Sequence, residues 1–132
     1  MTMRKRVAVA AAVLALGGGL AVLPSSPAAA AYTCRYSERG IYAYAGYYSG
    51  NTVQPSSTGV SNAGIEAQCL LKAYGYPPGT IDGVFGTNSR SAAKAFQRHM
   101  NLAFDAGLVE DGKVGPATWP WLREMVAITT SP

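Results

Sequence analysis

Apolar residues recur at helical spacing in three stretches of the second half of the chain. This spacing predicts helices over about residues 61–74, 87–102 and 116–127. The pattern therefore predicts a mainly α fold, a three-helix bundle over residues 61–127, with a frayed tail at 128–132. The residues expected to face the common core are Ala63, Ala67, Leu70, Leu71 and Tyr74 in the first helix, Ser89, Ala92, Ala93, Phe96 and Met100 in the second, and Trp119, Leu122 and Val126 in the third.

The first 31 residues have the pattern of an export signal. Arg4, Lys5 and Arg6 form a basic start, and residues 7–16 form an apolar run that is too short to span a membrane. Alanines at 29–31 supply the small residues that cleavage needs. We expect a mature chain that begins at Tyr32, secreted and not held in a membrane. A retained anchor is the alternative.

Removing this segment changes the charge balance. The whole chain has a formal net charge of +4, with 11 Lys and Arg against 7 Asp and Glu. Three of the positive charges lie at positions 4–6, so 8 remain against 7, which leaves +1. The basic balance belongs mostly to the export signal. It therefore does not indicate a nucleic-acid partner.

The first predicted helix has a second apolar stripe, formed by Ile65, Cys69 and Ala73, nearly opposite the first stripe. A three-helix bundle buries only one face of this helix, so another part of the chain must cover the second face. An even number of cysteines in an exported protein is typical of a disulfide. We therefore predict a Cys34–Cys69 bond that attaches the N-terminal segment to the helix. Two free thiols or an intermolecular bond are the alternatives.

Residues 32–60 form a tyrosine-rich segment that ends in a stretch rich in Ser, Gly and Pro. Alternation over residues 41–45 weakly favours an extended piece, and residues 49–59 are typical of a loop or linker. The tyrosines either pack against the first helix or form an aromatic platform for sugar rings. They are Tyr32, Tyr36, Tyr42, Tyr44, Tyr47 and Tyr48.

One pattern of residues occurs twice in the helical region. A repeat at fixed offset indicates a repeated structural unit. Within each copy, Asp-Gly is strong turn chemistry, because Gly adopts positive φ at little cost and Asp bonds to nearby backbone. We expect the glutamine of each copy to hydrogen-bond to its turn. The pairs, each 29 positions apart, are Gln68 and Gln97, Asp82 and Asp111, Gly86 and Gly115, and Ser89 and Thr118.

These motifs, in this order, resemble the peptidoglycan-binding domain family, a three-helix module of bacterial cell-wall hydrolases. The resemblance covers about residues 61–125. Two features depart from the family pattern: residues 101–110 are longer than usual, and Pro120 replaces an ordinary helix former. The motifs that carry the resemblance are Gln68, Gly75-Tyr76, Ile81-Asp82-Gly83-Val84-Phe85-Gly86, Ala92-Ala93-Lys94-Ala95-Phe96-Gln97 and Asp111-Gly112-Lys113-Val114-Gly115-Pro116-Ala117-Thr118-Trp119.

The resemblance implies an exported monomer that binds peptidoglycan, through its glycan or its stem peptide, in a shallow groove beside the first Asp-Gly turn and the second helix. No cofactor or metal is expected. In this interpretation Asp82 holds the loop, Phe85 and Trp119 offer apolar surface, and Arg90 and Gln97 offer hydrogen-bond donors. A place in the core is the alternative for Phe85 and Trp119.

The sequence favours binding over catalysis. The lone His99 cannot build a zinc site while the cysteines are in a disulfide. Glu66, expected to face outward, could pair with Glu110 or Asp105, but no spacing selects such a pair. Two rivals remain: a minimal wall hydrolase that uses Glu66 or Glu110, and a module that inhibits or escorts a secreted hydrolase. The stripe of Arg90, Lys94 and Arg98 is either a solvated face or a contact surface for acidic wall groups.

Overall fold

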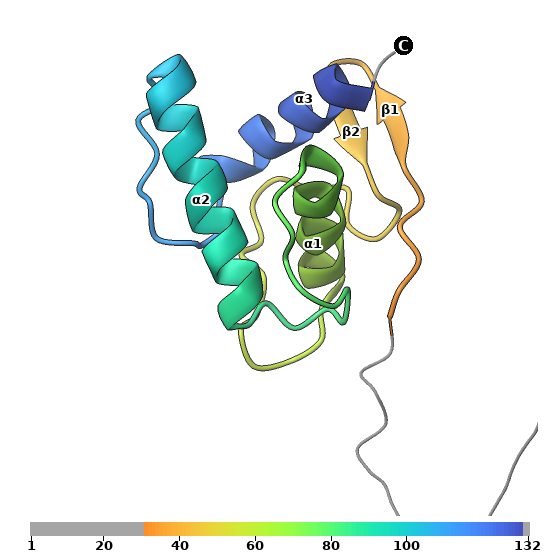
Figure 1. Cartoon of the computed structure of the whole chain (residues 1–132). Coiled ribbons are helices and arrows are strands. Elements are labelled where there is room, and N and C mark those ends of the chain that lie inside the picture. Colours follow the sequence, from red (N-terminus) through yellow and green to blue (C-terminus); the bar gives the residue numbers. More distant parts are fainter. Residues whose placement is uncertain (1–30, 131–132) are drawn as a thin grey trace, which may run out of the picture. The chain divides into compact units, whose positions relative to one another are not determined.

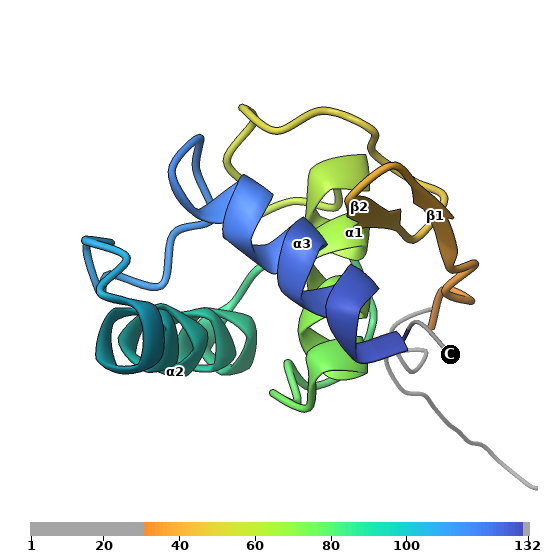
Figure 2. The same cartoon turned by 90° about the horizontal axis from the view of Figure 1, so that it is seen from above.

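The computed structural model describes residues 31–130, which belong to one structural unit. The expected export signal lies, apart from residue 31, outside the described residues. Figures 1 and 2 show α1 with α2 on one side, the strands on the other and α3 crossing above. The elements are the strands β1 (Ser37–Arg39) and β2 (Tyr42–Tyr44) and the helices α1 (Asn62–Tyr74), α2 (Thr87–Phe104) and α3 (Thr118–Thr130).

The three helices form where the sequence predicts them, and their ends have local causes. Ser61 caps α1, because its hydroxyl accepts a hydrogen bond from the Gly64 N–H at 3.0 Å. Gly75 ends α1 with φ of +99°, a left-handed conformation that glycine adopts easily. Helix α3 continues to Thr130, so residues 128–130 are helical and the expected frayed tail there is wrong. Residues 131–132 lie outside the described part.

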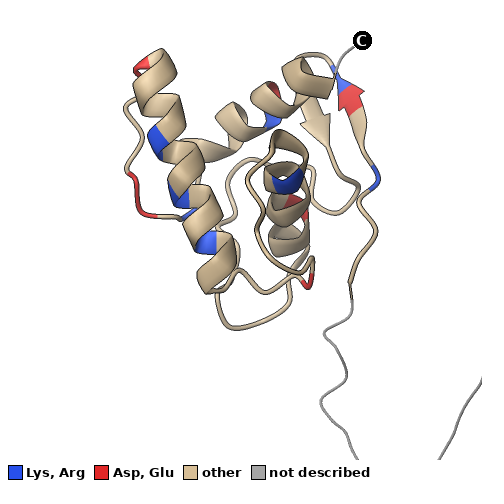
Figure 3. Cartoon of the chain, in the orientation of Figure 1, with Lys and Arg blue, Asp and Glu red and all other residues tan. Residues whose placement is uncertain are grey.

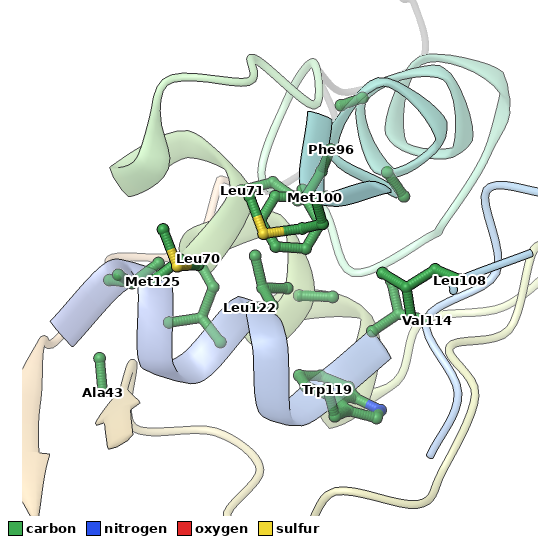
Figure 4. Close-up of a cluster of buried hydrophobic side chains, with 14 of the residues drawn as sticks. Ala43, Leu70, Leu71, Phe96, Met100, Leu108, Val114, Trp119, Leu122 and Met125 are labelled. Atoms are coloured by element: carbon green, nitrogen blue, oxygen red, sulfur yellow. The ribbon is translucent and has the colours of Figure 1, made fainter. Parts of the chain in front are cut away.

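The helices share one apolar core (Figure 4). Every residue predicted to face this core is buried except Tyr74, which packs at its edge. Leu70, Phe96 and Leu122, one from each helix, are fully enclosed. The periodicity therefore identified the correct face of each helix.

The tyrosine-rich segment covers the other face of α1. Its strands pair antiparallel, with Ser37 opposite Tyr44, and Cys34 is bonded to Cys69 as predicted. Ala45, Ile65, Cys69 and Ile81 form a second buried cluster beneath this segment. The prediction that the two cysteines attach the N-terminal segment to α1 is confirmed. Of the second stripe only Ala73 differs, because it packs against the main core.

The stretch of residues 49–59 is a loop, and it packs across the helical bundle instead of forming a separate linker. The Trp119 indole donates a hydrogen bond to the Val53 carbonyl at 2.9 Å, and the Phe85 N–H donates to the Ser56 carbonyl at 2.9 Å. Pro55 is buried. The loop therefore belongs to the folded unit.

The long stretch of residues 101–110 is part helix and part loop. Helix α2 extends to Phe104, and Asp105 then adopts a left-handed conformation with φ of +53°. The Asn101 side chain accepts a hydrogen bond from the Leu108 N–H and donates one to the Leu108 carbonyl, both at 2.8 Å. The Asn101 amide thus gives the Leu108 N–H and carbonyl the hydrogen-bond partners that a helix or strand would otherwise supply.

A buried ion pair joins the segment to the bundle. Glu66 was expected to face outward, but it is 0% exposed and lies 2.7 Å from Arg123, which is also 0% exposed. The Glu66 carboxylate also accepts hydrogen bonds from the N–H groups of Ala45, Tyr47 and Tyr48. The expectation failed because these groups come from a distant part of the chain, and helical periodicity gives no information about contacts with distant segments.

Glu66→Gln should therefore destabilise the protein strongly. The change leaves the Arg123 charge buried without a counter-charge, and breaking such a pair costs about 3–5 kcal/mol. Urea unfolding measures this free energy. Glu124→Gln, on the less buried side of α3, is the matched control, with an expected change within about 0.5 kcal/mol. A loss below about 1 kcal/mol for Glu66→Gln would contradict the role of the pair.

Removing the disulfide should also lower stability. The bond closes a separation of 35 residues, which corresponds to about 3–4 kcal/mol in the chain-entropy model. The double variant Cys34→Ala, Cys69→Ala should show this loss in urea unfolding relative to the oxidised protein. Equal stability of the two proteins would show that the buried contacts hold the segment unaided.

Candidate functional site

Each Asp-Gly turn is held by a buried glutamine. In the first copy, Gln68 Nε2 lies 3.0 Å from Asp82 Oδ1, from the Val84 carbonyl oxygen and from Ser89 Oγ. Gln68 Oε1 accepts a hydrogen bond from the Gly83 N–H at 2.8 Å. One side chain thus fixes both sides of the turn and the start of α2.

The second copy repeats this network. Gln97 Nε2 lies 3.3 Å from Asp111 Oδ1, 3.0 Å from the Lys113 carbonyl oxygen and 3.1 Å from Thr118 Oγ1. Gln97 Oε1 accepts from the Gly112 N–H at 2.8 Å. The prediction that both glutamines hydrogen-bond to the turns is confirmed.

The first turn lies directly against α1. Gly83 has φ of +81°, and a Cβ on Gly64 would lie 2.2 Å from the Gly83 carbonyl oxygen. Only glycine at position 64 allows this approach. The glutamine networks and this close contact together give the turns fixed positions beside α2.

A first hollow, the first-turn hollow, opens beside Asp82. It has a volume of about 160 Å³ and runs from Pro78 to the N-terminal turn of α2, where Asn88 and Ser89 contribute. Asp82 is half-buried, and its Oδ1 also accepts the Val84 N–H at 3.0 Å. Asp82 therefore holds the loop that forms one wall.

A second hollow, the two-turn hollow, lies between the two Asp-Gly turns and the loop of residues 49–59. Its volume is about 270 Å³. Two of the side chains that line it, Arg90 and Lys113, are cationic, and none of the described residues lining it is acidic. Arg90 Nη1 donates to the Phe85 carbonyl at 3.3 Å, which orients its guanidinium. The remaining lining residues are Gln54, Pro55, Ser57, Phe85 and Gly112.

Residues 61–122 match the family model described as "Putative peptidoglycan binding domain". Over these residues the chain is similar to that family. No curated protein and no solved structure matches the chain. The match begins at the N-cap of α1 and ends within α3. The tyrosine-rich segment therefore lies outside the matched peptidoglycan-binding domain.

The structure places the predicted contact residues at different depths. Asp82 lines the first-turn hollow, and Arg90 and Phe85 line the two-turn hollow. The expectation of an accessible donor is corrected for Gln97, which is 1% exposed, whereas for Phe85 and Trp119, at 2% and 0% exposed, the alternative of a place in the core holds. Phe85 and Trp119 fill the core, and the polar atoms of Gln97 bond to the second turn.

Sequence reasoning missed Lys113 and the loop wall of the two-turn hollow. Lys113 follows the second Asp-Gly pair directly, so the repeat itself marked its position. No local signal placed Gln54 and Ser57 there, because their loop is held by distant partners. Only tertiary contacts assemble this wall.

Basic residues follow one another along α2 (Figure 3), and their surroundings differ. Arg90 enters the two-turn hollow, whereas Lys94 and Arg98 are exposed. Arg98 Nη1 lies 3.7 Å from Glu110 Oε1 at the surface. Such an exposed pair contributes little to stability. Because Lys94 is exposed and lines neither hollow, it is a suitable control for charge changes on this helix.

Two of the carboxylates considered for hydrolysis, Glu66 and Glu110, are bonded within the protein, whereas Asp105 is exposed at the end of α2. Glu66 is enclosed with Arg123, so it cannot reach a substrate from the surface. Glu110 accepts a hydrogen bond from Asn101 at 3.0 Å. Within residues 31–130, no group of three or more His, Cys, Asp or Glu could hold a metal ion, and no helix has the length and hydropathy to cross a membrane.

Gln68→Ala and Gln97→Ala should destabilise the protein by similar amounts, at least about 2 kcal/mol each. Each change leaves buried donors and acceptors of one turn without partners, and each such group costs about 1–3 kcal/mol. Thermal or urea unfolding measures the effect, with Lys94→Ala as the control. If either glutamine variant unfolds like the wild type, its network does not support the turn.

Proposed function

We propose that the protein binds bacterial cell-wall peptidoglycan and does not cleave it. The match of residues 61–122 to the peptidoglycan-binding domain family carries this proposal. The complete pair of glutamine networks supports it, because they hold the turns and the α2 residues beside both hollows. A binding module of this kind acts by positioning polar groups, so it requires no cofactor.

The two-turn hollow is our proposed contact site for an acidic group of the wall, such as a stem-peptide carboxylate. Arg90 can donate two parallel hydrogen bonds to a carboxylate, and Lys113 adds a second positive charge. The first-turn hollow, with Asp82, would take hydroxyl or amide groups of the same polymer. The two hollows flank residues 82–90 and together form the proposed groove.

Export belongs to the same proposal. Residues 1–31 carry a basic start, an apolar run and small residues before Tyr32, as a secretory signal does. The disulfide agrees with an oxidising compartment outside the cytoplasm. We infer that the mature protein acts as a secreted monomer associated with the cell wall.

Co-sedimentation with purified insoluble peptidoglycan tests the function directly. We expect the protein to pellet with the wall, while the supernatant gains no sugars or peptides. Release of soluble fragments would overturn the non-catalytic proposal. Absence from the pellet would remove wall binding and direct the search to a secreted protein partner.

Arg90→Ala and Lys113→Ala should each weaken wall binding about 10- to 150-fold, which corresponds to losing one charge-assisted hydrogen bond of about 1.5–3 kcal/mol. Binding isotherms from the pelleting assay measure the change. Lys94→Ala removes the same charge from the exposed face of α2 and should bind as the wild type does. Equal weakening by all three changes would indicate only a general charge effect.

A further inference from the structure

A third hollow lies in the tyrosine-rich segment, outside the matched domain. This tyrosine hollow has a volume of about 290 Å³ and is lined by Ser37 and Arg39 of β1, Tyr44 of β2 and residues 46–49. Ser37, Arg39 and Tyr44 share one face of the hairpin, because Ser37 pairs with Tyr44 and side chains alternate along a strand. Ala43, on the other face, enters the bundle core. The hollow therefore opens away from the core.

The hairpin wall of the tyrosine hollow is held by two cations. The Arg39 guanidinium lies 4.1 Å from the centre of the Tyr44 ring, and the Arg123 guanidinium lies 4.4 Å from it. Arg123 is buried and bonded to Glu66, whereas Arg39 is exposed. The ring is thus fixed from the protein side, and Arg39 is the cation that a ligand can reach.

The loop wall is fixed as well. Glu66 accepts the N–H groups of Tyr47 and Tyr48, and Arg123 donates to the carbonyl oxygens of Tyr48 and Gly50. The Tyr48 hydroxyl accepts backbone N–H groups from the next part of the loop. A wall ordered before binding reduces the entropy that a ligand must lose.

The chemistry of the lining is selective. Tyr47 and Tyr48 offer apolar ring surface, and Tyr44, whose ring lies against the two guanidiniums, offers its edge. Ser37 and Ser49 offer hydroxyls, and Arg39 offers a planar cation. None of the described residues lining the hollow carries a carboxylate, so nothing there repels an anion. The volume lies just below the range of about 300–1,000 Å³ for ligand pockets, which suits one ring-sized group.

We propose that the tyrosine hollow binds a sugar unit that carries a carboxylate. A pyranose ring has apolar C–H faces for the tyrosines and hydroxyls for Ser37 and Ser49, and its carboxylate can form two parallel hydrogen bonds with Arg39. The site is separate from the two hollows beside α2. It does not depend on the proposed binding of peptidoglycan.

Titration of the purified protein with methyl glucuronide, followed by amide NMR shifts, tests this site. We expect shifts confined to residues 37–49 and their neighbours, and an affinity at least fivefold higher than for methyl glucoside, which has the same ring without the carboxylate. Arg39→Gln should remove this preference while the protein stays folded, because Arg39 is exposed. Arg98→Gln, an exposed arginine on α2, should leave the preference intact.

Three results would overturn the proposal: no shifts in residues 37–49, equal affinity for the two sugars, or the same shifts and affinity with acetate alone. An acidic peptide that binds this hollow more tightly than the glucuronide would also overturn it. Co-sedimentation of the Arg39→Gln variant with peptidoglycan distinguishes the sugar-site proposal from the wall-binding proposal. If only the sugar-site proposal is wrong, the protein still pellets with peptidoglycan. If only the wall-binding proposal is wrong, the glucuronide still causes the NMR shifts in residues 37–49.

Discussion

The contact between Glu66 and Arg123 is the interaction on which the arrangement of the chain depends. Arg123 can donate five hydrogen bonds, and all are used: to Glu66, to the Asn51 side chain and to three backbone carbonyl oxygens. Glu66 in turn accepts three backbone N–H groups besides Arg123. A buried pair that lacked these partners would cost more in lost hydration than it returns. The charges and the loop around them therefore require each other.

This mutual requirement explains why the tyrosine-rich segment is part of the fold and not an appendage. The ion pair holds the segment from α1 and α3, and the disulfide holds it at a second point on α1. Both faces of α1 are consequently buried. A three-helix module alone would leave Ile65 and Cys69 exposed, so the segment completes the protein's interior.

The same architecture produces separate surfaces for recognition. The glutamine networks set the turns beside α2, where Arg90 and Lys113 line one hollow. The ion pair sets the loop after β2, where Arg39 and three tyrosines line another. Each surface has an exposed or half-buried cation on a wall fixed by buried polar contacts. Such preorganisation favours the binding of weak ligands, because the protein loses little conformational entropy when a ligand binds.

Local patterns determined much of this protein. Helical periodicity located three helices and their core faces, the 29-residue repeat predicted the glutamine networks, and the second stripe on α1 with two cysteines predicted the attached segment. These inferences succeeded because each rests on neighbours along a helix or on a repeated turn. Glu66 was misplaced because its partners lie 57 residues away in α3 and 18 to 21 residues away in the hairpin segment.

The contact residues show the same division. Arg90 was found from the sequence because it lies beside the first turn on the exposed side of a helix. For Phe85 and Trp119 the sequence left both surface and core open, and the structure places them in the core, where the loop of residues 49–59 covers them from outside the repeat. The sequence of that loop has no hydrophobic periodicity, so only the groups with which it forms hydrogen bonds determine its path. Sequence alone determined the helices and turns, and the tertiary structure decided which side chains remain exposed, because exposure depends on what the distant segments cover.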